Sequence, residues 1–281
     1  MAEIVNVTYK TADGTEWPLQ MEKLVRIKSA NFHNWIYEPE TLARRYGVRV
    51  MRFGKTAAAY ITTLYFGGSI EDRKTRIDDF HTAIEKDLRA GTPGRLTWLD
   101  WYIDCFIRTS STYPDQKTDY TVNDVEVYVP YPFWIKPRTV SFERQEYDPD
   151  AYDWLDYPYD YAFDYSPEPA GEGQIVNDAT GPAEFKLIYY GPIADPRATI
   201  AGIPRGVSVI LEEDDYLTID SRQKTVILQK ANGDTINAFN YRDKGQSIFT
   251  PIPIGGSQIL WPGTFGFDLT IYRERSEPAW S

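Results

Sequence analysis

The chain has 281 residues, of which 42% are hydrophobic and 25% are charged, as in globular proteins with a sizeable core, and this length favours two domains. Its formal net charge is −11, and it shows no cluster of Lys and Arg that could displace counterions from phosphates, so we expect no sequence-specific nucleic-acid partner. Cys105 is the only cysteine, which excludes an intrachain disulfide. No apolar run reaches the roughly 18 residues that span a bilayer, so we expect no membrane contact. The first residues lack the basic start and apolar stretch of a signal peptide, and synthesis is therefore expected in a cytoplasm.

The first predicted elements are a hairpin and a strand. Asp13-Gly14 is a strong signal for a tight turn when alternating segments flank it. Such segments occur on both sides of the turn, with apolar residues at Val5, Val7, Tyr9, Trp17 and Leu19. A further strand is predicted over 58–66, where Tyr, Ile, Thr and Leu predominate before Gly67-Gly68.

One helix is predicted over 69–90. Its apolar residues follow the three-to-four spacing of one helical face, at Ile70, Ile77, Phe80, Ile84 and Leu88. Ser69 is a favourable N-cap, and Asp72 occupies the position of a capping-box acid. Gly91, with Pro93 two residues later, is typical of a helix end. We expect this helix to pack against a sheet.

Period-two patterns follow the helix. One strand is predicted over 96–107, with a shared face that carries Leu99, Trp101, Ile103, Cys105 and Ile107. A second strand is predicted over 122–129. The proline-rich run at 130–134 then ends the pattern, because proline cannot donate to a strand ladder. We expect Phe133, Trp134 and the strand around Trp101 at a domain junction or in a core.

The segment 143–178 differs from the rest in charge and in aromatic content. It holds eleven acidic residues against one basic residue, Arg144. Aromatic residues recur at every second position from Tyr157 to Tyr165, so an extended chain would place the rings on one side and the acids on the other. We predict a strap that packs its rings onto a neighbouring sheet or subunit, with a glycan-binding surface as the alternative. The candidate residues for either role are Trp154, Tyr157, Tyr159, Tyr161 and Tyr165.

The last third of the chain is predicted as strands and turns. A flexible break is expected over 167–173, and short strands over 207–211, 216–220 and 224–229. Asn232-Gly233 closes another hairpin. Two further strands are predicted from the alternating apolar residues Phe185, Leu187, Tyr189, Phe265, Phe267, Leu269 and Ile271. Several short strands with frequent turns indicate a β-sandwich.

Few residues in the sequence suit catalysis. The two histidines, His33 and His81, do not fall in a pattern that pairs a base with a nucleophile, and no G-x-S-x-G motif occurs. Cys105 alternates with large apolar residues, which is typical of a buried and inert thiol. We therefore predict no catalytic residue and no enzyme activity.

Acidic residues could hold a cation or cleave a glycan, but a solvated surface explains them better. The aspartates at 148, 150, 153 and 156 do not match the spacing of a calcium loop. The run 212–215 could supply the carboxylate pair of a glycosidase, yet it precedes a predicted strand and is better explained as an exposed turn. The sequence shows neither a phosphate-binding loop nor a set of zinc ligands. We predict no metal and no cofactor.

Several sequence blocks, in the same order along nearly the whole chain, resemble the distal tail proteins of siphophages. The run VYVPYPFW at 127–134 resembles the end of that family's N-terminal domain, and GGSIEDR at 67–73 resembles the entry to its central helix. DYLTIDS at 215–221 resembles another strand of the family. Further similar blocks lie at 93–96, 100–102, 239–241 and 274–280. The segment 143–178 is longer and more acidic than in compact members, which leaves its role open.

The resemblance implies a mainly β fold with two β-sandwich or barrel-like domains. An N-terminal ring-forming domain would span 1–138, with the helix 69–90 packed on it. An acidic aromatic linker or strap would span 139–180, and a galectin-like sandwich would span 181–281. The protein would be a structural component of the virion, a homohexameric baseplate hub ring assembled in the bacterial cytoplasm. Its partners would be further copies of itself, the tail-tube protein and the tail-tip fibre or receptor-binding protein of host attachment. DNA would pass through the ring without being read.

A carbohydrate-binding module is the second hypothesis for the function. Such a module would attach a virion or a cell-surface protein to host glycans, among them cell-wall polysaccharide. It would do so through the aromatic residues of 157–165, since aromatic platforms with nearby acids can hold sugars. Saturable polysaccharide binding that is lost when these tyrosines are replaced would distinguish it from the strap.

Overall fold

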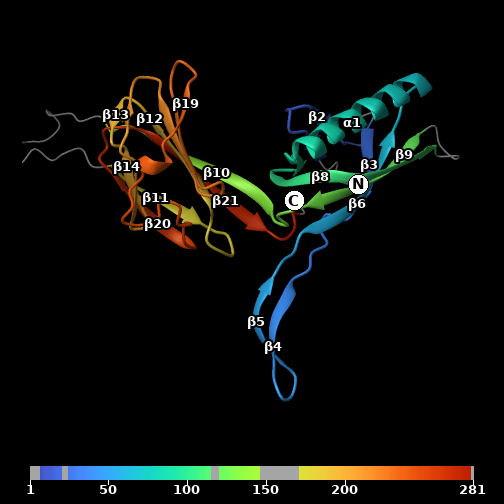
Figure 1. Cartoon of the computed structure of the whole chain (residues 1–281), viewed down its shortest axis with the longest axis horizontal. Helices are drawn as coiled ribbons and strands as arrows, with labels where there is room; N and C mark the ends of the chain where they lie inside the picture. Colours follow the sequence, from blue (N-terminus) through green and yellow to red (C-terminus); the bar gives the residue numbers. More distant parts are fainter. Residues whose placement is uncertain (1–6, 21–24, 115–119, 146–170, 280–281) are drawn as a thin grey trace, which may run out of the picture. The chain divides into compact units, whose positions relative to one another are not determined.

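The computed structural model describes residues 7–20, 25–114, 120–145 and 171–279 and divides the chain into two compact units (Figure 1). The first unit takes in Met1–Lys136 and Arg275–Ser281, and the second takes in Pro137–Glu274. The units are built mainly of antiparallel strands, with an α-helix in the first, which confirms the predicted fold class. No helix among the described residues combines the length and the apolar character needed to cross a membrane.

The first unit contains an antiparallel sheet, a helix that packs on it and a separate hairpin. Its strands are β1 (Val7–Lys10), β2 (Glu16–Pro18), β3 (Val25–Ala30), β4 (Glu38–Ala43), β5 (Val48–Gly54), β6 (Ala58–Phe66), β7 (Gly94–Trp98), β8 (Trp101–Pro114), β9 (Thr121–Val129) and the start of β10 (Trp134–Phe142). The sheet order is β3–β6–β9–β8–β7–β1–β2, because the long β8 pairs with β7 along its first half and with β9 along its second. Trp101 and Trp134 lie in the core of this unit, as predicted.

The helix α1 (Ile70–Ala90) forms where the sequence predicts it. Ser69 accepts a hydrogen bond from a backbone N–H of the first turn, and Gly91 ends the helix in the left-handed conformation with φ of 64°. Phe80 is fully buried, and its ring centroid lies 5.2 Å from that of Trp17. The apolar face of the helix therefore holds it against the first unit's sheet (Figure 1).

A buried acid fixes the last turn of the helix. Asp87 is 3% exposed, and it accepts hydrogen bonds from the hydroxyl of Tyr9 at 3.1 Å and from the backbone N–H of Ala12 at 3.0 Å. Burial raises the pKa of Tyr9, so the phenol keeps its proton and continues to donate. These bonds join α1 to the hairpin β1–β2.

The prediction of one strand over 96–107 is wrong, because two strands and a tight turn occupy this range. β7 ends at Trp98 and β8 begins at Trp101, and these two residues are cross-strand partners. Leu99 turns the chain with a φ of 53°, a conformation that Gly or Asn usually takes, so the sequence carries no turn signal here. The predicted buried face is confirmed for Trp101, Ile103, Cys105 and Ile107.

The second unit is a sandwich of two antiparallel sheets around one core. One sheet has the order β19–β18–β17–β12–β21–β10, and the other has the order β11–β20–β14–β15. The strands are β11 (Gly171–Asn177), β12 (Phe185–Tyr190), β13 (Ile193–Ala194), β14 (Arg197–Ile200), β15 (Ile203–Gly206), β16 (Ile210–Leu211), β17 (Tyr216–Asp220), β18 (Thr225–Gln229), β19 (Thr235–Asn237), β20 (Gly255–Trp261) and β21 (Phe267–Arg275). Fully buried side chains come from both sheets, among them Leu187, Leu217, Ile200 and Ile259.

Two predictions for the second unit are wrong, whereas β12, β17, β18 and β21 confirm the others. The predicted break at 167–173 contains the start of β11. A Cβ added at Gly171 would lie 2.2 Å from the ring of Trp261, so this glycine permits close packing within a strand. Of the strand predicted over 207–211, only Ile210 and Leu211 form a strand, β16, whereas Val207 makes an isolated bridge with Arg242.

Candidate assembly surface

The residues that the sequence singles out for binding lie outside the described part of the chain. Trp154, Tyr157, Tyr159, Tyr161 and Tyr165 all fall within 146–170, as do the four aspartates considered for calcium. Their role as a strap or as a glycan-binding surface stays a prediction.

His81 lies in a polar cluster that joins α1 to β8 and β9. Its Nε2 atom lies 3.1 Å from the hydroxyl of Ser110 and 2.9 Å from the amide nitrogen of Asn123. A serine–histidine pair works only when Nε2 is available to take the hydroxyl proton and another group orients the second ring nitrogen. Here the buried Asn123 amide shares Nε2 with Ser110, so the arrangement fits a structural joint better than a catalytic pair.

The thiol of Cys105 is fully buried, and burial raises its pKa, which disfavours the reactive thiolate. His33 lies beside Trp98 with ring centroids 5.4 Å apart, and burial lowers its pKa. Among the described residues, no three His, Cys, Asp or Glu side chains are grouped as a metal site would require.

The prediction of an exposed turn at 212–215 is wrong for its last residue. Asp215 is 2% exposed, and it accepts a hydrogen bond from Lys230 Nζ at 2.6 Å and from the backbone N–H groups of Glu212 and Ala231 at 2.9 Å each. These bonds lower the pKa of Asp215 and leave its oxygens committed to the turn before β17. The carboxylate therefore stabilises the fold and is not available as half of a catalytic pair.

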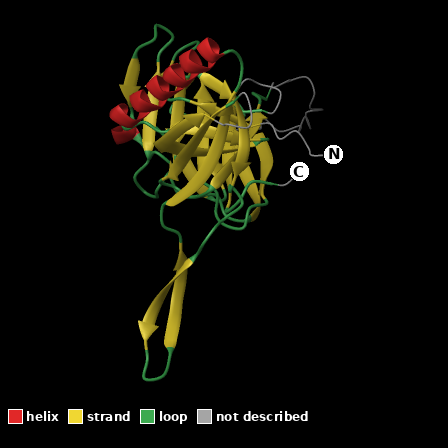
Figure 2. Ribbon diagram, turned by 90° about the vertical axis from the view of Figure 1, so that its right-hand side faces the viewer, coloured by secondary structure: helices red, strands yellow, loops and turns green. Residues whose placement is uncertain are grey.

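The hairpin β4–β5 is the most exposed apolar structure of the described chain, and we call residues 38–54 the arm. Every residue of its two strands is exposed. The strands pair only with each other, and the arm projects from the helix and sheet of its own unit (Figures 1 and 2). Its exposed large apolar residues are Leu42, Tyr46, Val48, Val50, Met51 and Phe53, with exposed fractions from 44% to 83%.

Strand register divides the arm into two unlike faces. Directly paired residues of an antiparallel ladder share a face, so the pairs Pro39–Phe53, Thr41–Val50 and Ala43–Val48 form one face that is almost entirely apolar. The opposite face carries the ion pair of Glu40 with Arg52, and the pair Leu42–Arg49. A bulge at Met51 lets Val50 and Phe53 share the apolar face although they are three positions apart. The arm is therefore amphipathic, and no described residue of its own unit covers the apolar side.

The arm is also basic in an acidic protein. From Glu38 to Gly54 the sequence holds four Arg and two Glu, whereas acidic residues exceed basic ones by eleven over the whole chain. Arg44 and Arg45 lie at the tip beside Tyr46, which is 83% exposed. The arm can therefore be attracted to an acidic surface at the same time as its apolar face is buried.

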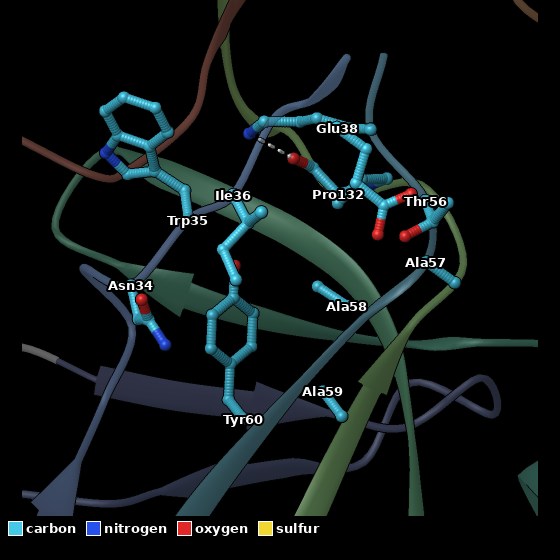
Figure 3. Close-up of a pocket in the computed structure, with 11 residues that line it drawn as sticks. Asn34, Trp35, Ile36, Glu38, Thr56, Ala57, Ala58, Ala59, Tyr60 and Pro132 are labelled. Carbon is cyan, nitrogen blue, oxygen red and sulfur yellow. Dashed lines mark hydrogen bonds between the residues drawn. The ribbon is translucent and has the colours of Figure 1, made fainter. Parts of the chain in front are cut away.

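At the root of the arm, aromatic side chains gather around Lys55. The ammonium lies 4.6 Å from the ring centroid of Phe133, 4.9 Å from that of Tyr37 and 6.0 Å from that of Trp35. It donates a hydrogen bond to the carbonyl of Pro132 at 3.1 Å. A cavity of about 220 Å³ opens beside these groups, and Figure 3 shows Trp35, Ile36, Tyr60 and Pro132 among the residues around it.

Solved structures share this fold along nearly its whole length. A chain from the structure of the phage p2 baseplate in its activated conformation with Sr aligns with a TM-score of 0.67, 14% identity, and coverage of 98% of this chain and 100% of that chain. The corresponding comparison with the Ca form gives a TM-score of 0.66 at the same identity. The SPP1 Dit (gp 19.1) protein, described as a paradigm of the hub adsorption apparatus in phages that infect Gram-positive bacteria, aligns with a TM-score of 0.59, 8% identity, and coverage of 97% and 100%.

At these identities the likeness establishes the fold, and function requires further argument. No protein-family model matches the sequence, and no curated protein matches it either. The fold match nevertheless agrees with the family that the sequence blocks resemble.

Proposed function

We propose that this chain is a structural subunit of a phage tail tip, a distal tail protein whose copies form a closed ring. The ring would hold six copies, join the tail tube to the tip that attaches to the host, and let DNA pass through its lumen. The likeness of the whole chain to a phage baseplate chain and to a protein of a hub adsorption apparatus supports this proposal. The virion tail is then its location, and the tail-tube protein and the receptor-binding tip are its partners.

The observation that carries the proposal is the uncovered apolar face of the arm. A two-stranded hairpin on its own is marginally stable in water, and strands gain stability when an apolar face is covered. Val50 and Phe53 stand 44% and 62% exposed on that face. Each large apolar side chain that becomes buried contributes about 1.5–3 kcal/mol, so a surface that covers the arm stabilises both the contact and the hairpin.

A second copy is the covering partner that a closed ring requires. In a cyclic assembly every subunit has two different contact surfaces, and the first surface of each subunit binds the second surface of the next subunit. The arm is basic and the rest of the chain is acidic, with most of the acidic excess in 143–178, so the charges of two copies can attract each other. We therefore assign the arm as one of the two ring surfaces.

A structural role also agrees with the environment of the reactive side chains. The Cys105 thiol is buried, Nε2 of His81 is shared between two polar groups, and the oxygens of Asp215 are committed to a turn. We accordingly propose no enzymatic activity for this chain.

Light scattering of the full chain at micromolar concentration tests the proposal. The wild type should form a discrete oligomer that appears as rings in negative-stain images. Val50→Asp with Phe53→Asp places charges on the apolar face of the arm and should give a monomer with an unchanged folding transition. Ile210→Asp, at a position 69% exposed in the second unit, is the matched control and should assemble like the wild type.

Two outcomes would contradict the proposal. One is a wild type that stays monomeric at high concentration. The other is an arm variant that assembles with the affinity of the wild type, because the arm would then contribute nothing to the ring.

A further inference from the structure

The arm joins its unit through two single connections, and Lys55 lies where they meet the sheet. One connection runs from Trp35 to Tyr37 into β4, and the other runs from Lys55 out of β5 toward β6. The turn between β9 and β10 carries Pro132 and Phe133, and both of these residues contact Lys55 of the second connection. The ammonium group of Lys55 thus joins its own connection to two other segments, 35–37 and 132–133.

The ammonium group of Lys55 is surrounded by aromatic rings and a carbonyl oxygen, as cations bound in aromatic cages are. Ammonium groups are attracted to the faces of aromatic rings within about 6 Å, and three rings satisfy this distance. The rings also support each other, since the centroids of Trp35 and Tyr37 are 5.5 Å apart and those of Tyr131 and Phe133 are 5.2 Å apart. We call Trp35, Tyr37 and Phe133, together with the carbonyl of Pro132, the lysine cage.

The cage replaces a carboxylate partner. Burial lowers the pKa of Lys55, and within the described part of the chain no acidic side chain forms an ion pair with it. A cation that loses part of its hydration shell without a counter-charge needs other compensation. Here the ring faces and the carbonyl oxygen supply it, so the energy of the contact depends on the geometry of all three segments.

We propose that Lys55 is the positioning residue of the arm, and that its caged ammonium sets the direction in which the arm leaves the sheet. This proposal rests on the proposed function in so far as the arm is the ring contact. A free hinge would let the arm sample many directions, and each subunit would lose that freedom on assembly. A caged root holds the arm near the direction that the next copy needs, so assembly costs less entropy.

The direct test measures the direction of the arm when it has no partner. Cysteines introduced at Arg45 on the tip and at Lys86 on α1 take spin labels, whereas the buried Cys105 does not. The distance distribution between the labels is measured by double electron–electron resonance in the full chain carrying Val50→Asp and Phe53→Asp, which leaves the arm without a neighbour.

Lys55→Met keeps the length of the side chain and removes its charge, and it should broaden the distance distribution about twofold. Lys55→Arg keeps a cation that can stack on rings and donate to the carbonyl, and it should retain the narrow distribution. Lys74→Met removes a charge from an exposed position on the helix and is the matched control. Phe133→Leu, which removes one ring and keeps Lys55, should give an intermediate width.

A second measurement connects the cage to assembly. In a chain with an intact arm face, Lys55→Met should raise the concentration of half-assembly about tenfold, because a subunit with a freely directed arm loses that freedom when it assembles. A tenfold change corresponds to about 1.4 kcal/mol. Lys55→Arg should stay within about threefold of the wild type.

The possible failures can be told apart. A narrow distribution of label distances in Lys55→Met overturns the proposal. A broad distribution in Lys55→Arg or in the Lys74→Met control overturns it as well. A wild type that never assembles removes the proposed ring, but the distance measurement still decides whether Lys55 directs the arm.

Discussion

The arm and the β12–β17 pair are both antiparallel strand pairs with an apolar face, yet among the described residues only the second is covered by its own chain. In that pair Leu187 lies opposite Ile219, and Tyr189 lies opposite Leu217. All four side chains are fully buried. In the arm, Val48 and Phe53 are about 60% exposed. The same local pairing therefore leads to a core in one place and to an open surface in the other.

The difference shows what each pair depends on. The face of β12–β17 packs against the second sheet of its sandwich, so its stability is internal to one chain. Within the described ranges no second layer covers the arm, and under the proposed function its apolar residues are buried by another copy. Substitutions in the sandwich should therefore change folding, and substitutions in the arm should change assembly.

The largest expected effect comes from truncating a leucine of the sandwich core. Leu187→Ala should lower the free energy of unfolding by about 2–5 kcal/mol, because it removes buried methyl groups and leaves a cavity. Leu42→Ala makes the same change in the arm, where the side chain is 57% exposed, and should shift that free energy by less than about 0.5 kcal/mol. Urea unfolding followed by tryptophan fluorescence compares the two. Equal losses would show that the arm folds as part of a core.

Two caged cations extend the comparison. Arg205 is fully buried, stacks 4.0 Å from the ring centroid of Phe185, and donates to the carbonyl of Thr250 at 2.8 Å. Lys55 makes the same kinds of contact at the root of the arm. Burial lowers the pKa of Arg205 to about 10, which leaves it charged at neutral pH.

Arg205→Met should lower the free energy of unfolding by about 1–3 kcal/mol, because buried carbonyl groups lose their donor. Lys55→Met should cost less than about 1 kcal/mol in the same measurement, since its cage is partly open to solvent. Thermal unfolding of both variants and the wild type shows which substitution lowers the free energy of unfolding more. If Lys55→Met were the more destabilising change, the root of the arm would be a folding core and not a positioning device.

Much of the fold could be predicted because buried strands and the helix carry strong local signals. The α1 pattern, its cap at Ser69 and its end at Gly91 are all local, as is the period of two in β17 and β21. The turn at Leu99 could not be predicted, because a leucine with positive φ has no signal in the sequence. Glycines at the start of β11 suggested flexibility, whereas Gly171 makes room for the ring of Trp261 and Gly173 makes room for that of Phe142.

The arm and its root could not be predicted, for two physical reasons. The bulge at Met51 breaks the period of two, so that Phe53 shares a face with Val48 and Val50 although it is three positions from Val50 in the sequence. In addition, the burial of an apolar face depends on what lies opposite, and a local pattern does not contain that information. The lysine cage joins positions 35, 37, 55 and 133, a combination that only the fold brings together.

A smaller effect that depends on pH is expected at the turn before β17. The bonds from Lys230 and two backbone N–H groups lower the pKa of Asp215 below its ordinary value of 3.8. Because the pKa of Asp215 is lower in the folded chain than in the unfolded chain, the carboxylate stabilises the fold at pH values above its unfolded-state pKa. This stabilisation is lost as the pH falls through the pKa of the folded state. Asp215→Asn should therefore be less stable than the wild type at neutral pH, and the difference should shrink below about pH 4. Urea titrations at neutral and acidic pH measure it, and a constant difference would contradict the assignment.

The smallest effect on folding, and the sharpest contrast with assembly, is expected at Phe53. The ring is 62% exposed, so Phe53→Ala should leave the free energy of unfolding of the separated subunit within about 0.5 kcal/mol of the wild type. Burying the Phe53 side chain between two subunits would contribute about 1.5–3 kcal/mol to assembly. Its loss in Phe53→Ala should therefore raise the concentration of half-assembly about 10- to 100-fold. Light scattering across a dilution series measures the second quantity, and Ile236→Ala, 43% exposed on β19, is the control. A change in the free energy of unfolding with unaltered assembly would contradict the assignment. The apolar face of the arm would then stabilise its own unit and not a contact between subunits.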